Sequence, residues 1–134
     1  NDIARNYGIH IVEDACHAIL AKFKNRNAGN LGDIGCFSFH PLKNLNVWGD
    51  GGVITTNNTE LSDKLRLMRN HGLSGRNSCE IFSYNSRLDT IQAVVANHLL
   101  LELSNSPVAN FFLCSIASIG GDPVINMGVK VASS

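Results

Sequence analysis

The sequence lacks an excess of charge of either sign, because its eleven basic residues are balanced by eleven acidic ones. Proteins that bind nucleic acid or an anionic membrane surface usually carry a basic patch. The sequence also lacks any run close to the roughly 20 apolar residues that a membrane-spanning helix requires. We therefore expect neither nucleic acid nor a membrane among the partners of this protein.

Closely spaced pairs of cysteines are also absent. The four cysteines are Cys16, Cys36, Cys79 and Cys114. Two of them lie in apolar stretches, where a free cysteine behaves as a small hydrophobic residue. Cys16 and Cys36, each close to a histidine, do not have the paired spacing of a structural zinc site, so we predict no metal. Unpaired cysteines favour a reduced, cytoplasmic protein.

Two common enzyme motifs are missing as well. There is no Gly-x-Ser-x-Gly elbow of an α/β-hydrolase, and Gly49-Asp50-Gly51-Gly52 matches neither a dinucleotide fingerprint nor a P-loop. An initiator Met and a signal peptide are absent, and the first residues resemble the end of a helix, so we expect a piece of a longer protein. The 134 residues, 44% hydrophobic and 16% charged, still suffice for a folded domain.

The pattern of apolar runs predicts an α/β domain with a parallel or mixed sheet. Strands are expected at residues 9–12, 18–23, 34–39 and 53–56, where apolar and β-branched residues gather. A short helix is expected over residues 1–7, with Gly8 as its stop. Residues 73–84 are expected to form a polar loop.

Two further helices are predicted from capping residues and helical periodicity. The first begins near Asn57 or Asn58, where Asn57 and Glu60 resemble a capping box, and it stops at Gly72. The second begins near a box-like segment at residues 86–89 and ends before Pro107. Their expected buried faces are Leu61, Leu65 and Met68 in the first, and Leu88, Ile91, Val95 and Leu99 in the second.

Lys43 is the residue with the clearest chemical potential. It lies between an apolar, aromatic-rich strand at residues 34–39 and the glycine cluster at residues 49–52. Asp14 ends another apolar stretch, and α/β sheets place ligands at strand ends. Pyridoxal phosphate (PLP) requires a lysine for a Schiff base, a carboxylate at the pyridine nitrogen and hydroxyls at the phosphate. Lys43, Asp14 and Ser38 fit these three requirements by type.

Several motifs together resemble the DegT-type sugar aminotransferases, which are fold-type-I PLP enzymes. They are Glu13-Asp14-Ala15-Cys16-His17-Ala18, the segment from Gly32 to Leu45, Gly49-Asp50-Gly51-Gly52, Arg69-Asn70-His71-Gly72, and Tyr84-Asn85-Ser86-Arg87-Leu88-Asp89 with Gln92-Ala93. The resemblance covers about residues 1–103, in order. Each motif alone is weak, but five in the same order are highly specific.

The resemblance implies a role for each of five residues. Lys43 corresponds to the Schiff-base lysine, and Asp14 to the acid that pairs with the pyridine nitrogen. His17 stands where the family has Gln or His near the ring oxygen of the cofactor, and Ser38 corresponds to a phosphate ligand. Asn85 corresponds to an asparagine that reaches the phosphate in the neighbouring subunit. The resemblance therefore implies a homodimer with shared active sites.

The implied reaction transfers an amino group, usually from glutamate, to a keto-sugar nucleotide for amino-sugar or polysaccharide biosynthesis. A PLP-dependent sugar dehydratase is an alternative, although members with other chemistry replace the lysine by histidine. A non-catalytic dimerising remnant is a third possibility.

The resemblance also sets expectations for the architecture. Family members are about three times as long, with a PLP domain followed by a smaller one. We expect residues 1–106 to form part of the PLP-binding large domain, with a mixed, mostly parallel sheet flanked by helices. Residues 107–134 form a tail that does not resemble the family. Without the other segments, we expect this chain alone to be a weak or inactive catalyst.

Each proposed site residue also has an ordinary structural explanation. Lys43 by itself would be a surface lysine, and Asp14 could cap a following helix. Ser38 could be a core hydroxyl with its hydrogen bond satisfied. His17 could be a histidine bonded to the backbone.

Overall fold

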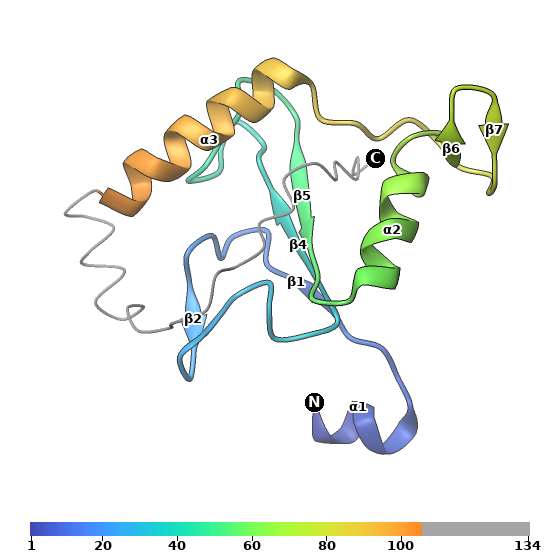
Figure 1. Cartoon of the computed structure of the whole chain (residues 1–134). Helices are drawn as coiled ribbons and strands as arrows, with labels where there is room; N and C mark the ends of the chain where they lie inside the picture. The colour runs from blue at the N-terminus through green and yellow to red at the C-terminus, as the bar shows by residue number, and fades with distance from the viewer. Residues whose placement is uncertain (106–134) are drawn as a thin grey trace.

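The computed structural model describes residues 1–105, and they are built around a three-stranded mixed sheet (Figure 1). Its strands are β1 (Val12–Asp14), β4 (Ile34–Ser38) and β5 (Gly52–Thr55), in the order β1-β4-β5. β1 and β4 are parallel, with Val12 opposite Ile34, whereas β4 and β5 are antiparallel. The predicted mixed sheet is therefore confirmed. The predicted tail at residues 107–134 lies outside the described residues.

Three helices and two small hairpins surround the sheet. The helices are α1 (Asp2–Tyr7), α2 (Thr59–Met68) and α3 (Thr90–Asn105). The hairpins are β2 (Lys22–Phe23) with β3 (Arg26–Asn27), and β6 (Leu73–Gly75) with β7 (Ser78–Cys79). In Figure 1, α3 lies at the end of the sheet where β4 finishes, and α1 lies at the opposite end. Among the described residues, no helix has both the length and the apolar character to cross a bilayer.

The main buried cluster lies between α3 and the loop that joins β4 to β5. Phe39, Leu45 and Val47 from this loop pack with Ala96 of α3, and each is at most 5% exposed. Phe39 donates its N–H to the oxygen of Gly51 and accepts one from Val47, so the loop is closed on itself. Burial of this apolar surface is the main force that fixes the loop around Lys43.

Several predicted elements are confirmed and others need correction. The first helix is confirmed, and Gly8 ends it with a left-handed φ of 61°. The strand expected at residues 9–12 was placed too early. Ile11 donates its N–H to the Asp33 side chain rather than to a sheet partner, so the ladder begins at Val12. Only residues 22–23 of the strand expected at 18–23 are extended, because successive backbone bonds form turns at residues 15–21.

The predicted start and buried face of the second helix were partly wrong. Asn58, rather than Asn57, is the N-cap, and its side-chain oxygen accepts the N–H of Leu61 at 3.1 Å. Glu60 therefore stands one position too early for a capping box. Met68 is 45% exposed, although it was expected in the buried stripe.

The segment after α2 is more ordered than the sequence suggested. The loop expected at residues 73–84 contains the β6–β7 hairpin. The last helix starts at Thr90 rather than near Ser86, because the Ser86 N–H bonds to the Arg69 oxygen and ties this segment to the end of α2. Its buried residues are Val95 and Ala96, while Ile91 is exposed.

Candidate active site

The candidate site lies at the edge of the sheet where β1 and β4 end. Because these strands are parallel, their carboxyl ends meet at one edge, which is where α/β proteins place ligands. Asp14 is the last residue of β1 and is opposite Cys36. Ser38 is the last residue of β4 and is opposite Gly52, the first residue of β5. The sheet therefore brings Asp14 and Ser38 to the same edge.

Lys43 and His17 are in direct contact, although 26 positions separate them in the chain. The Lys43 Nζ lies 2.6 Å from His17 Nε2 and 3.5 Å from His17 Nδ1. The Lys43 N–H also bonds to the His40 oxygen at 2.9 Å, which makes a turn after β4. At 2.6 Å the two nitrogens share a hydrogen bond, which one of them donates and the other accepts.

Asp14 presents an ionised carboxylate next to this pair. Its Oδ1 accepts the N–H of Cys16 at 3.1 Å. The Cys16 thiol, the Cys16 N–H, and the nearby His17 and Lys43 lower the pKa of Asp14 below its ordinary value. The carboxylate is exposed, so it can face a cationic group of a ligand.

The other two predicted ligands, Ser38 and Asn85, lie in different parts of the structure. Ser38 is half-buried, and its Oγ accepts the His40 N–H at 3.2 Å. Asn85 forms an isolated antiparallel β-bridge with Asn70, which follows α2, and the Asn85 Oδ1 accepts the N–H of Arg87. Asp14, His17 and Lys43 are therefore brought together, Ser38 shares their edge of the sheet, and Asn85 has its contacts at the end of α2.

Sequence reasoning gave no site role to three residues that the structure shows in contact with this region. Cys16 holds Asp14, and its own thiol pKa is raised, mainly by its hydrogen bond to Asp14. His40 accepts the Leu42 N–H on its Nδ1, and this bond shapes the turn before Lys43. Gln92 of α3 donates to the Asp50 oxygen at 3.0 Å. The proximity of Cys16 to Asp14 in the sequence could have indicated its role, whereas the contact of Gln92 with Asp50 depends on how α3 packs.

No group of three His, Cys, Asp or Glu side chains within residues 1–105 is arranged to hold a metal ion.

Comparisons with solved structures define the class of fold. The chain superposes on an aminotransferase from Brucella abortus with a TM-score of 0.75 and 33% identity, over 96% of this chain and 36% of that one. It superposes on DesV from S. venezuelae with a TM-score of 0.74 and 39% identity, over 92% of this chain and 35% of that one. The predicted fold, part of a PLP-transferase large domain, is confirmed.

The family follows from the sequence comparison. Residues 1–109 match the model of the DegT/DnrJ/EryC1/StrS aminotransferase family, and the chain belongs to this family. The resemblance inferred from the motifs is confirmed.

Two curated relatives illustrate the likeness. The chain is 46% identical over 93 residues to a UDP-N-acetyl-3-dehydro-alpha-D-glucosamine 3-aminotransferase of Acidithiobacillus ferrooxidans, covering 69% of this chain and 25% of that protein. It is 38% identical over 125 residues to a dTDP-3-amino-3,4,6-trideoxy-alpha-D-glucose transaminase of Streptomyces venezuelae, covering 90% and 33%. The chain thus spans a quarter to a third of the length of these relatives.

Proposed function

We propose that the protein to which this chain contributes transfers an amino group from glutamate to a keto-sugar nucleotide, with PLP held at Lys43. Membership of the family supports amino transfer. The names of the relatives, which include UDP-sugar and dTDP-sugar aminotransferases, support a sugar nucleotide as the acceptor. A related structure from Bacillus subtilis, 34% identical with a TM-score of 0.70 over 84% of this chain and 26% of that one, contains the cofactor PMP.

The contact of Lys43 with His17, beside the Asp14 carboxylate, is the observation that carries this proposal. An amine, an imidazole and an ionised carboxylate at one edge of the sheet fit the donor set that PLP needs. When bound, PLP supplies a ring that accepts electrons from the substrate carbon. In our assignment, Lys43 holds the cofactor covalently, Asp14 faces the ring nitrogen and Ser38 binds the phosphate.

We assign His17 three tasks at this site. Its imidazole holds the flexible Lys43 side chain in place, and the 2.6 Å contact lets it exchange a proton with Nζ. Lys43 is half-buried and lies in the loop that contributes Phe39, Leu45 and Val47 to the core cluster. We also assign His17 to the ring oxygen, as the resemblance implies.

The wider arrangement belongs to the same proposal. Asn85 contacts the cofactor phosphate of a partner subunit in a homodimer, and residues 1–106 form part of the PLP-binding large domain. The protein is cytoplasmic, where keto-sugar nucleotides are substrates for biosynthesis. Alone, this chain is a weak or inactive catalyst, because it spans only part of the length of its relatives.

Covalent trapping of the cofactor tests the proposal. The chain is incubated with PLP, reduced with borohydride and digested, and the modified peptide is identified by mass spectrometry. We expect a visible absorbance band and label on Lys43, and both should be lost in Lys43→Ala. Lys24→Ala, which removes an exposed lysine of the β2–β3 turn, is the matched control and should keep both.

Two further outcomes separate the alternatives. Label that stays after Lys43→Ala, or spreads evenly over the lysines, would refute the assignment of Lys43. If the full-length protein is labelled at Lys43 and this chain is not, the chain is a remnant without its own site. Incubating the full-length protein with glutamate and a keto-sugar nucleotide then distinguishes amino transfer from dehydration by its product.

A further inference from the structure

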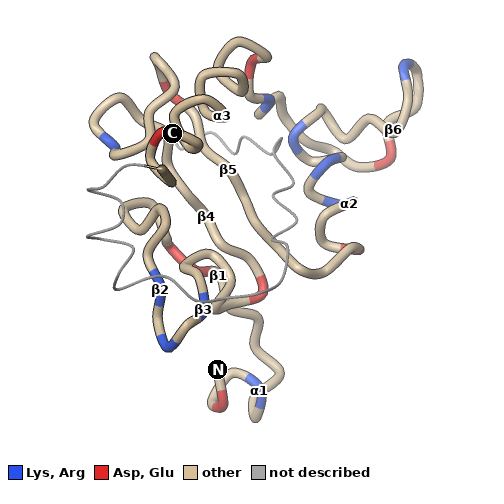
Figure 2. Tube along the Cα trace, turned by 60° about the vertical axis from the view of Figure 1, so that its left-hand side comes forward, with Lys and Arg blue, Asp and Glu red and all other residues tan. Residues whose placement is uncertain are grey.

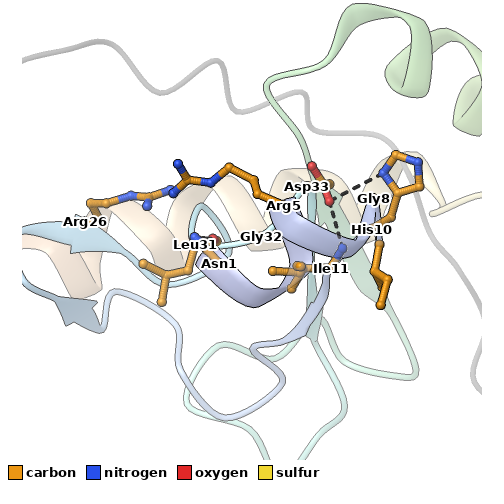
Figure 3. A pocket seen from close by; sticks show the side chains of 11 residues that line it. Asn1, Arg5, Gly8, His10, Ile11, Arg26, Leu31, Gly32 and Asp33 are labelled. Atoms are coloured by element: carbon orange, nitrogen blue, oxygen red, sulfur yellow. Dashed lines mark hydrogen bonds and ion pairs between the residues drawn. The ribbon is translucent and has the colours of Figure 1, made fainter.

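A cavity lies at the opposite edge of the sheet from Lys43. It has a volume of about 530 Å³ and is lined by the end of α1, the segment that leads into β1, β3 and the turn before β4 (Figure 3). Ile11 and Asp33, which directly precede β1 and β4, are part of its wall. The volume falls within the range of small-molecule sites, and nothing in the proposed amino transfer uses this cavity.

Two arginines from separate elements share this cavity. Arg5 comes from α1 and Arg26 from β3, and in Figure 3 their guanidinium groups extend toward one another. Arg5 pairs with Asp2 at 3.1 Å, and Arg26 donates to the Asn30 oxygen. Since each guanidinium has five N–H donors, several donors on each side remain available to a ligand.

Arg5 and Arg26 give the cavity lining two cationic side chains against one carboxylate, and Asp2, outside the lining, pairs with Arg5. Figure 2 shows basic residues on α1 and on the β2–β3 hairpin at the same end of the molecule. Asp33 is the one acidic residue of the cavity lining. Its Oδ2 accepts the Ile11 N–H at 2.7 Å and lies 3.6 Å from His10 Nδ1, so its carboxylate turns away from the arginine pair in Figure 3.

We infer that this cavity binds a small phosphorylated compound, with a phosphate or diphosphate group held between Arg5 and Arg26. Planar guanidinium groups match phosphate oxygens in pairs of parallel hydrogen bonds. A phosphate group alone would fill only part of the cavity, so there is room for an organic group against Leu31 and Ile9. The site is separate from the edge of the sheet that carries Lys43, so this inference does not depend on the proposed amino transfer.

Calorimetric titration of the chain with inorganic pyrophosphate at constant ionic strength tests this inference. We expect saturable binding that Arg5→Gln and Arg26→Gln each weaken by about tenfold, or about 1.4 kcal/mol. Asp33→Asn keeps an acceptor for the Ile11 N–H and removes a negative charge, so it should strengthen binding. Arg76→Gln, in the exposed turn between β6 and β7, is the matched control and should leave binding unchanged.

Several results would overturn the inference of an anion site between Arg5 and Arg26. The inference is overturned if no saturable heat appears up to about 10 mM pyrophosphate, or if Arg76→Gln weakens binding as much as Arg5→Gln. Far-UV circular dichroism of each variant checks folding. A variant that unfolds can only lose binding, so stronger binding by Asp33→Asn identifies a charge effect, and weaker binding by folded Asp33→Asn counts against an anion.

Discussion

Two leucines close to Lys43 on either side of it differ sharply in burial. Leu42 is 88% exposed, whereas Leu45 is 2% exposed and belongs to the core cluster with Ala96 of α3. Leu45→Ala removes three carbon atoms from this cluster. At about 0.8 kcal/mol per buried methylene, plus the cost of the remaining cavity, we expect a loss of about 3 kcal/mol in the free energy of unfolding.

Urea unfolding followed by far-UV circular dichroism measures this loss. Leu42→Ala makes the same chemical change in the same loop but at an exposed position, so it should alter the free energy of unfolding by no more than about 0.5 kcal/mol. Because small domains are stable by only about 5–15 kcal/mol, the effect of Leu45→Ala should be clear in the midpoint. The slope of the transition should be unchanged if the surface exposed on unfolding is unchanged.

The same pair of variants tests whether the core cluster positions Lys43. Leu45→Ala should also reduce PLP labelling of Lys43, because it loosens one end of the loop, whereas Leu42→Ala should not. A loss below about 1 kcal/mol for Leu45→Ala, or equal losses for the two variants, would contradict the view that this cluster holds the loop.

Three further predictions concern single groups. The pKa of Asp14 is lowered, so the stability that its carboxylate contributes is present at neutral pH and is lost as the pH falls through the folded-state pKa. In Asp14→Asn, the free energy of unfolding should therefore fall less steeply between about pH 5 and about pH 2. Gly72→Ala should lower the free energy of unfolding by about 2 kcal/mol or more, because φ is +72° and the new Cβ would lie 1.7 Å from a backbone oxygen. Urea unfolding measures this loss. Gly75→Ala should not show it, because a Cβ at Gly75 would meet no atom within 4 Å. Burial raises the pKa of Cys36, so iodoacetamide should label it more slowly than exposed Cys79, and equal rates would contradict this.

Local signals in the sequence predicted the elements that depend on neighbouring residues. Gly8 ends α1 in the left-handed conformation, as expected from a glycine after a short helix. The apolar run at residues 34–39 became β4 with an error of one residue. Errors arose where a distant residue supplied the hydrogen bond, as when the Asp33 side chain held Ile11 outside the ladder and the end of α2 held Ser86 outside α3.

For the site, residue type and motif order in the sequence alone were sufficient to single out Lys43, Asp14, His17 and Ser38 and to indicate the family. Only the tertiary structure decided which of them meet. The parallel pairing of β1 with β4 puts Asp14 and Ser38 at one edge, and the turn after β4 puts Lys43 against His17. The physical reason is that chemical type belongs to each residue, whereas contact across 26 positions depends on sheet register and on the buried cluster that closes the loop.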